Sequence, residues 1–243
     1  MEQIASILIT SSLCGMLAHA LSSMEIRRIR RKEGVKADGP LIQGLDLFII
    51  MLISALMQVG ALDGGPEVMA IAGAFGAFLA AAAWSDAKTG WVPDSSIISA
   101  LVFGALSAWC WHMGAAPNIF QGLWLALGAL AVFGALVFSY LNFSWFRMTP
   151  PDFSFVLLIL ITPTDMVQMI VVLMALILSI LLVKMRPQWV RALIPADERE
   201  RLTSQMEEAL DLDSGHMEKN GWYPVGPIAM LCVLAGYCAN VLM

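Results

Sequence analysis

The sequence predicts an all-α polytopic membrane protein with about eight transmembrane helices and a short cytoplasmic amphipathic helix. Hydrophobic residues make up 59% of the 243 positions and charged residues only 14%. The mean hydropathy is +0.76. These values differ strongly from those of soluble globular domains. We therefore expect a single integral membrane domain over residues 1–243.

The first apolar run, residues 3–22, follows Glu2 and has neither a basic segment before it nor a small-residue cleavage site. It is expected to remain as a transmembrane helix rather than to be removed as a signal peptide. The densest basic cluster, RRIRRKEGVK, follows at residues 27–36. Because basic loops are retained in the cytoplasm, the sequence predicts a basic cytoplasmic loop at 24–43 and an outside N-terminus.

The later apolar runs alternate across the membrane from this loop, and most approach the ~20 residues that a transmembrane helix needs. The predicted spans cover residues 44–62, 67–84, 96–113, 119–140, 149–165, 166–183 and a last helix that ends at 243. Residues 184–224 are predicted to be a cytoplasmic loop. Within it, ADERERLTSQMEEALDL has apolar residues at helical spacing, which predicts an amphipathic helix with a solvated acidic face.

Two aspartates lie at the predicted cytoplasmic ends of apolar runs. Asp86, in WSDAKTGWVPD, ends one run, and a carboxylate at a membrane edge is costly unless it has a function or a partner. The candidate partner is Asp152 in RMTPPDF. Thr149 as N-cap and Pro150 in the first helical position predict that a helix begins there.

The surroundings of Asp86 resemble the first aspartate motif of the prepilin peptidase family. These membrane-embedded aspartic proteases remove leader peptides from type IV pilins and preflagellins. The resemblance covers residues 72–243 and includes a Val-Pro-Asp tripeptide and a proline-glycine entry into the last helix. The residues of these two elements are Val92, Pro93, Asp94, Pro224, Gly226 and Pro227.

The second motif departs from the family pattern. The family has GxGD, often with a lysine two residues later, whereas this chain has Thr149-Pro150-Pro151-Asp152 with Ser154 at the lysine position. Prolines fix the backbone and remove two N–H donors where glycines would let it approach a peptide closely. The pattern indicates either a divergent subsite or a site that has lost activity. The cysteine-paired cytoplasmic domain of the methylating subfamily is absent from this sequence, so no methyltransferase activity is expected.

The resemblance implies a leader peptidase of the bacterial cytoplasmic (inner) membrane, within type IV pilus assembly or protein secretion, that cuts a prepilin-like substrate. Its catalytic residues would be Asp86 and Asp152. Two aspartates that share one proton can supply both the base and the acid of peptide hydrolysis, and they titrate as a unit. No metal, cofactor or nucleic acid is expected; the partners are the substrate and membrane lipid. Residues expected to bind substrate or shape the site are Lys88, Val92, Pro93, Asp94, Thr149, Pro150, Pro151, Pro224, Gly226 and Pro227.

Other interpretations of the same residues stay open. Asp152 would also serve as the acid of a helix capping box, and Asp86 as an interfacial residue paired with Lys88. A small ion- or proton-coupled transporter would use Asp86, Asp152 or Asp165, although it predicts internal repeats and mid-membrane acids that the sequence does not show. A non-catalytic membrane assembly subunit is the third alternative.

Overall fold

The computed structural model describes residues 2–32, 44–113, 150–161, 163, 166–185, 200, 203–204, 207–208 and 225–242. These residues contain helices and short connections but no strand, which confirms the predicted all-α class. The elements are α1 (Glu2–Lys32), α2 (Gly44–Val59), the 3-10 turn η1 (Leu62–Gly64), α3 (Gly65–Thr89), α4 (Asp94–Met113), α6 (Pro150–Ile161), α7 (Met166–Met185) and α11 (Val225–Leu242).

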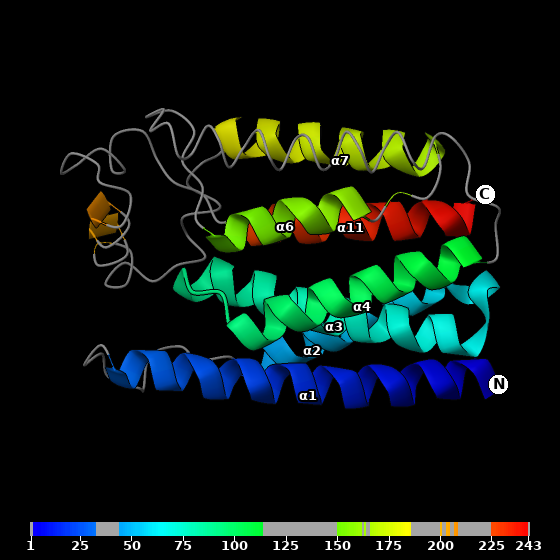
Figure 1. Ribbon diagram of the computed structural model, residues 1–243, viewed down its shortest axis with the longest axis horizontal. Helices are drawn as coiled ribbons and strands as arrows, with labels where there is room; N and C mark the ends of the chain where they lie inside the picture. Colours follow the sequence, from blue (N-terminus) through cyan, green and yellow to red (C-terminus); the bar gives the residue numbers. More distant parts are fainter. Residues whose placement is uncertain are drawn as a thin grey trace.

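The helices lie side by side along the long axis of the molecule (Figure 1). At one end α1, α3 and α7 finish and α2, α4, α6 and α11 begin; we call this the Asp86 end. The opposite end holds both chain termini and the turn between α2 and α3. All helix ends that carry the predicted site residues therefore lie at one end of the bundle.

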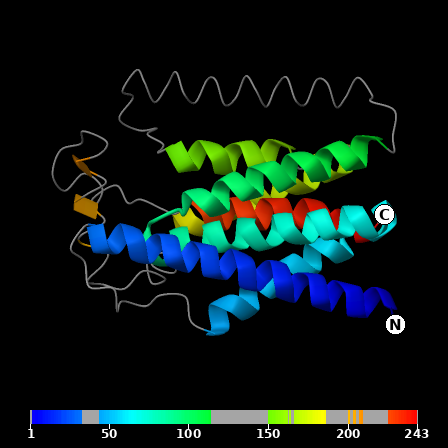
Figure 2. The same ribbon diagram turned by 60° about the horizontal axis from the view of Figure 1, so that its bottom comes forward.

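Helix α3 is the centre of the bundle and packs against α1, α2, α4 and α11. The run Ala80–Ala83 is fully or almost fully buried, as are Leu79 directly before it and Phe75 one turn before Leu79. Figure 2 shows α3 and α11 running alongside each other, while α1 and α2 cross each other below them in this view. A helix this enclosed needs small side chains, because neighbouring backbones must approach it closely.

Glycines mark the closest approaches between helices. A Cβ at Gly60 would lie 2.5 Å from the main-chain oxygen of Tyr237 on α11. A Cβ at Gly76 on α3 would lie 2.7 Å from the sulfur of Met57 on α2. Real Cβ atoms do not approach backbone oxygen this closely, so the contact at Gly60 requires glycine there.

Polar side chains inside the bundle are paired between helices. Gln58 on α2 donates a 2.8 Å hydrogen bond to the Ser11 hydroxyl on α1, and Ser54 donates to the carbonyl of Gly73 on α3. The hydroxyls of Ser107 on α4 and Tyr237 on α11 share a 2.5 Å hydrogen bond. Such bonds satisfy polar groups where water is excluded and also fix how the helices pair.

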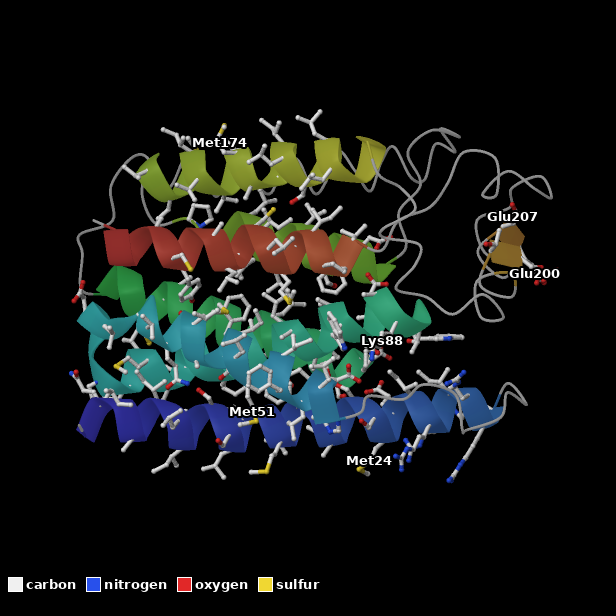
Figure 3. All side chains as sticks on the ribbon, turned by 180° about the vertical axis from the view of Figure 1, so that it is seen from behind. Met24, Met51, Lys88, Met174, Glu200 and Glu207 are labelled. Carbon is white, nitrogen blue, oxygen red and sulfur yellow. The ribbon has the colours of Figure 1, made fainter. Side chains whose placement is uncertain are left out.

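The outward faces of the bundle are apolar. Met24 on α1 and Met174 on α7 point away from the bundle on opposite sides and are 68% and 53% exposed (Figure 3). Two stretches among the described residues, Gln3–Lys32 and Leu62–Thr89, are long and apolar enough to cross a membrane, and four shorter apolar helices accompany them. Eight transmembrane spans therefore stay a prediction, and the span predicted at 119–140 lies outside the described residues.

Three predicted boundaries were wrong. The basic loop does not begin at residue 24, because α1 continues to Lys32 with Ile26 and Arg30 buried on its packed face; Arg and Lys are also good helix formers. The helix that starts near Asp152 ends at Ile161 rather than at 165, because Pro163 disfavours helical backbone in the residue before it. The loop predicted from residue 184 starts later, since α7 continues to Met185.

The predicted amphipathic helix is described only in fragments, at residues 200, 203–204 and 207–208, and these are helical. Glu200 and Glu208 are exposed, as expected of a solvated acidic face, whereas Glu207 is buried. The acidic residues of this segment therefore do not all lie on a solvated face.

Removing the Ser107–Tyr237 hydrogen bond should weaken the contact between α4 and α11. We expect Tyr237→Phe to lower the free energy of unfolding in detergent by about 0.5–1.5 kcal/mol, since a hydroxyl loses its partner inside the bundle. Ser107→Ala should give little further loss in the Tyr237→Phe background. Ser12→Ala is the control, because the Ser12 hydroxyl bonds only within its own helix and is exposed; an equal loss in this variant would contradict the interpretation.

Candidate acidic site at one end of the bundle

Asp86 lies in the last turn of α3 and is buried, with 6% of its surface exposed. Gly90 ends the helix in the left-handed conformation, φ 67°, and its N–H donates a 2.9 Å hydrogen bond to the main-chain oxygen of Asp86. Glycine adopts this conformation without steric cost, which is why helices commonly end at it. The TG dipeptide after Lys88 thus places the Asp86 carboxylate within one turn of the end of α3.

The Asp86 carboxylate contacts the first turn of α11. The N–H of Gly226 donates a 2.8 Å hydrogen bond to Oδ2 of Asp86. The first N–H groups of a helix have no partner within the helix, and the positive end of the helix dipole favours a negative charge there. The proline-glycine entry into the last helix therefore supplies a backbone donor to the first aspartate.

No side chain fits at Gly226. A Cβ there would lie 2.8 Å from Cα of Ala83, 2.9 Å from Oδ2 of Asp86 and 2.9 Å from Cζ of Phe155. The first of these atoms is backbone, and the other two belong to buried residues, so none can move away easily. Gly226 thus brings α3, α6 and α11 together at one point.

Asp152 lies in the first turn of α6 and is half-buried. Phe155, three residues later on the same face of the helix, is fully buried and touches the Gly226 position. Asp152 is close enough to Asp86 to act on it coulombically. The structure therefore brings together, at the Asp86 end, two aspartates that are far apart in the sequence.

The Val-Pro-Asp tripeptide forms the connection between α3 and α4. Pro93 is fully buried and Val92 packs against the core, while Asp94 is the first residue of α4. The N–H groups of Asp94 and Ser95 donate to the carboxylate of Glu25 on α1, at 2.9 and 3.1 Å. Glu25 thus caps α4 from another helix, and the tripeptide sets the direction in which α4 leaves α3.

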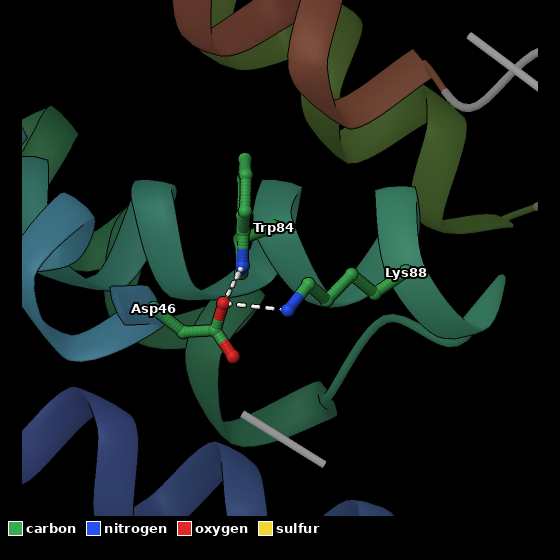
Figure 4. Close-up of polar contacts among 3 residues, drawn as sticks. All are labelled: Asp46, Trp84 and Lys88. Atoms are coloured by element: carbon green, nitrogen blue, oxygen red, sulfur yellow. Dashed lines mark hydrogen bonds and ion pairs between the residues drawn. The ribbon is translucent and has the colours of Figure 1, made fainter. Parts of the chain in front are cut away.

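Lys88 does not pair with Asp86. Its ammonium forms a 2.6 Å ion pair with Oδ1 of Asp46 on α2, and the indole N–H of Trp84 donates to the same oxygen at 2.6 Å (Figure 4). The ammonium also lies 5.5 Å from the centroid of the Trp84 ring. The alternative in which Lys88 is the partner of Asp86 was therefore wrong, since residues two positions apart on a helix point in different directions.

Sequence reasoning missed Asp46 and Glu25. Asp46 is a carboxylate in the first turn of an apolar helix. A carboxylate at a membrane edge is costly without a partner, so the sequence marks Asp46 as a candidate in the same way as Asp86. Glu25 lies two residues before the basic cluster, so its sequence neighbourhood suggests a local ion pair rather than a contact with α4. In both cases the partner lies on another helix, 42 positions away for Lys88 and 69 for the Asp94 N–H.

The remaining predicted site residues are less informative. Thr149 and Pro224 lie outside the described residues. Pro150 and Pro151 form the first turn of α6, and Pro227 is half-buried in the first turn of α11. Among the residues with a described position, no group of three or more His, Cys, Asp or Glu side chains is arranged to hold a metal ion.

The fold and the site define a bundle of apolar helices with an aspartate pair at one end, each aspartate beside the N-terminal turn of a helix. No protein-family model, curated protein or solved structure matches this chain.

Gly226→Ala should disrupt the point where three helices meet. We expect it to lower the free energy of unfolding by about 1–3 kcal/mol, because its Cβ has no space against Ala83 and Asp86. Chemical denaturation in detergent measures the change. Gly15→Ala is the matched control: its Cβ would come too close only to Cγ of Met51, a side-chain atom that a rotamer change can move, and not to backbone. Similar losses in the two variants would show that the contact at Gly226 is not special.

Proposed function

We propose that this protein is a membrane-embedded aspartic endopeptidase of the prepilin peptidase type. It would cleave the short basic leader from prepilin-like membrane proteins at the cytoplasmic face of the bacterial inner membrane. The observation that carries the proposal is that buried Asp86 and half-buried Asp152 lie at one end of the bundle, close enough to interact coulombically. Two neighbouring acids in a partly desolvated site can supply both the base and the acid for attack of water on a peptide bond.

The distribution of polarity supports a membrane location. Large apolar side chains on α1, α2, α4 and α7 are exposed, while serines and glutamines such as Ser54, Gln58 and Gln168 are buried. Lipid solvates an apolar exterior, and buried polar groups then pair between helices. The basic residues that end α1 lie at the Asp86 end, which would be the cytoplasmic end by the positive-inside bias.

The proposed chemistry uses both carboxylates and one water. When one aspartate is ionised and the other protonated, the ionised one accepts a proton from water while the protonated one donates to the peptide carbonyl oxygen. The water oxygen bonds to the carbonyl carbon, giving a tetrahedral intermediate. The C–N bond then breaks as the nitrogen takes up a proton, which leaves a new carboxyl group and a new amino terminus. We assign the two roles to the pair and not to either residue.

Gly226 would orient the dyad. Its N–H holds Oδ2 of Asp86, and in this scheme Oδ1 is the oxygen that exchanges protons. A backbone donor cannot rotate away as a side chain can, so the orientation is preorganised before substrate binds. This role gives a chemical reason for the glycine in the entry to the last helix.

The position of the pair determines which bond it can reach. Asp86 and Asp152 lie at helix ends, so they would meet a substrate where its apolar helix leaves the membrane. That is the junction between a cytoplasmic leader and a transmembrane segment. Carboxylates at this junction would attract a basic leader, and a glycine before the cut would avoid a clash with the dyad.

Removing either acid should abolish cleavage. We expect purified Asp86→Asn and Asp152→Asn to lose roughly 10²–10⁴-fold or more in rate on a prepilin-like peptide, because an amide keeps the shape but cannot transfer the proton. Mass spectrometry of the products locates the cut, which is expected directly after glycine at the leader boundary.

Asp63→Asn is the matched control, because Asp63 is an exposed carboxylate in η1 at the opposite end of the bundle. It should cleave at the wild-type rate. Wild-type rates in both dyad variants would remove the aspartates from the mechanism. A folded wild-type protein that cleaves no such peptide would instead favour the non-catalytic assembly subunit.

Reporter fusions test the orientation. Reporters placed after Arg31 and Lys88 should report the cytoplasm, and a reporter after Gly65 should report the outside, because the basic residues lie at the Asp86 end. Alkaline phosphatase and fluorescent-protein fusions give opposite signals on the two sides. An outside signal at Lys88 would place the dyad on the wrong face for a cytoplasmic leader.

A further inference from the structure

The polar cluster of Asp46, Trp84 and Lys88 has no place in the proposed chemistry, yet its contacts are specific and its carboxylate is buried. Asp46 is fully buried, and its Oδ1 accepts from both the Trp84 indole and the Lys88 ammonium (Figure 4). Trp84 and Lys88 are four residues apart, so they lie on one face of α3. A carboxylate on α2 thus holds the last turn and a half of α3 through two side chains.

Asp86 lies between these two residues in the sequence but on a different face of α3. Successive helix residues are rotated by about 100°, so Asp86 is turned by roughly 200° from both Trp84 and Lys88. On that other side, the Gly226 N–H of α11 holds its carboxylate. The same turn of α3 is therefore held by α2 on one side and by α11 on the other.

Because the two attachments oppose each other, loss of one should let the turn shift. Charge-assisted hydrogen bonds are the strong ones, and both donors meet Asp46 at 2.6 Å. A small displacement matters for catalysis: moving a reacting group by about 1 Å can reduce the rate on the order of 100-fold. The end of α3 is also where the helix backbone is least supported by its own hydrogen bonds.

We infer that Asp46 is a positioning residue for Asp86: by binding Trp84 and Lys88, it fixes the turn of α3 that presents Asp86 to Asp152. The inference rests on the proposed function for its catalytic consequence. The attachment of α3 to α2 is a separate consequence and can be measured without any substrate.

The test uses double variants, because removing one partner of a buried ion pair leaves an unpaired charge and destabilises the whole protein. Asp46→Leu/Lys88→Met removes the attachment without leaving a charge. Asp46→Asn/Lys88→Gln removes both charges but keeps groups that can hydrogen-bond to each other and to Trp84. We expect the first variant to lose roughly 100-fold in kcat, with KM little changed, and the second to retain most of the wild-type kcat.

Hydrogen exchange supplies the readout that does not depend on activity. In Asp46→Leu/Lys88→Met, amides of the peptide 84–91 should exchange about tenfold faster than in the wild type, and those of α4 should be unchanged. Ser54→Ala is the control, because it removes an interhelical hydrogen bond of α3 far from Asp86 along the helix. It should leave exchange in 84–91 unaltered.

The outcomes separate the two proposals. If the wild-type protein cleaves no leader but the 84–91 exchange rises as expected, the proposed function fails while the attachment stands. Wild-type kcat and wild-type exchange in Asp46→Leu/Lys88→Met would overturn the positioning role. If that variant does not fold, Asp46→Val/Lys88→Leu, which also removes the bonds to both Trp84 and Lys88 without leaving a charge, takes its place. A wild-type kcat together with wild-type exchange in this replacement variant would also overturn the inference.

Discussion

The close packing of α3 is the constraint on which the rest of the bundle depends. Its middle section presents alanine and glycine on almost every side, so α1, α2, α4 and α11 can all approach its backbone. Contacts such as that between Gly76 and Met57 leave no space for larger side chains. Because the neighbouring helices are held this closely, their positions determine which side chains the residues at the end of α3 can contact.

The polar contacts of the candidate site gather at the end of α3. Three side chains at alternate positions near the end of α3 contact two different helices: Trp84 and Lys88 bind Asp46 on α2, and Asp86 binds Gly226 on α11. Phe155 of α6 packs against the same point, and Asp152 lies about one turn before Phe155 on that helix. Burial makes the charged form of this acid costly, and the N–H of Gly226 at the start of α11 offsets part of that cost.

The same arrangement explains how a helix bundle can hold two acids close together at one end. Each aspartate lies on a regular helix rather than on a loop, and its backbone is fixed by helix packing. Residues held on rigid elements keep their geometry better than residues on loops. Proline in the first helical turn also stiffens the start of α6, the helix that carries Asp152.

The sequence alone determined the helical class, most helix positions and the two candidate aspartates, because apolar runs and isolated carboxylates within them are local features. It also marked Gly226 and the Val92-Pro93-Asp94 tripeptide by resemblance, without saying what they touch. Only the tertiary structure decided that Gly226 donates to Asp86, that Lys88 belongs to Asp46, and that Glu25 caps α4. Those pairings join residues from separate helices, and no local pattern carries the direction in which one helix faces another. For the same reason α1 extends past its apolar run: Ile26 and Arg30 are buried by neighbours that hydropathy does not register.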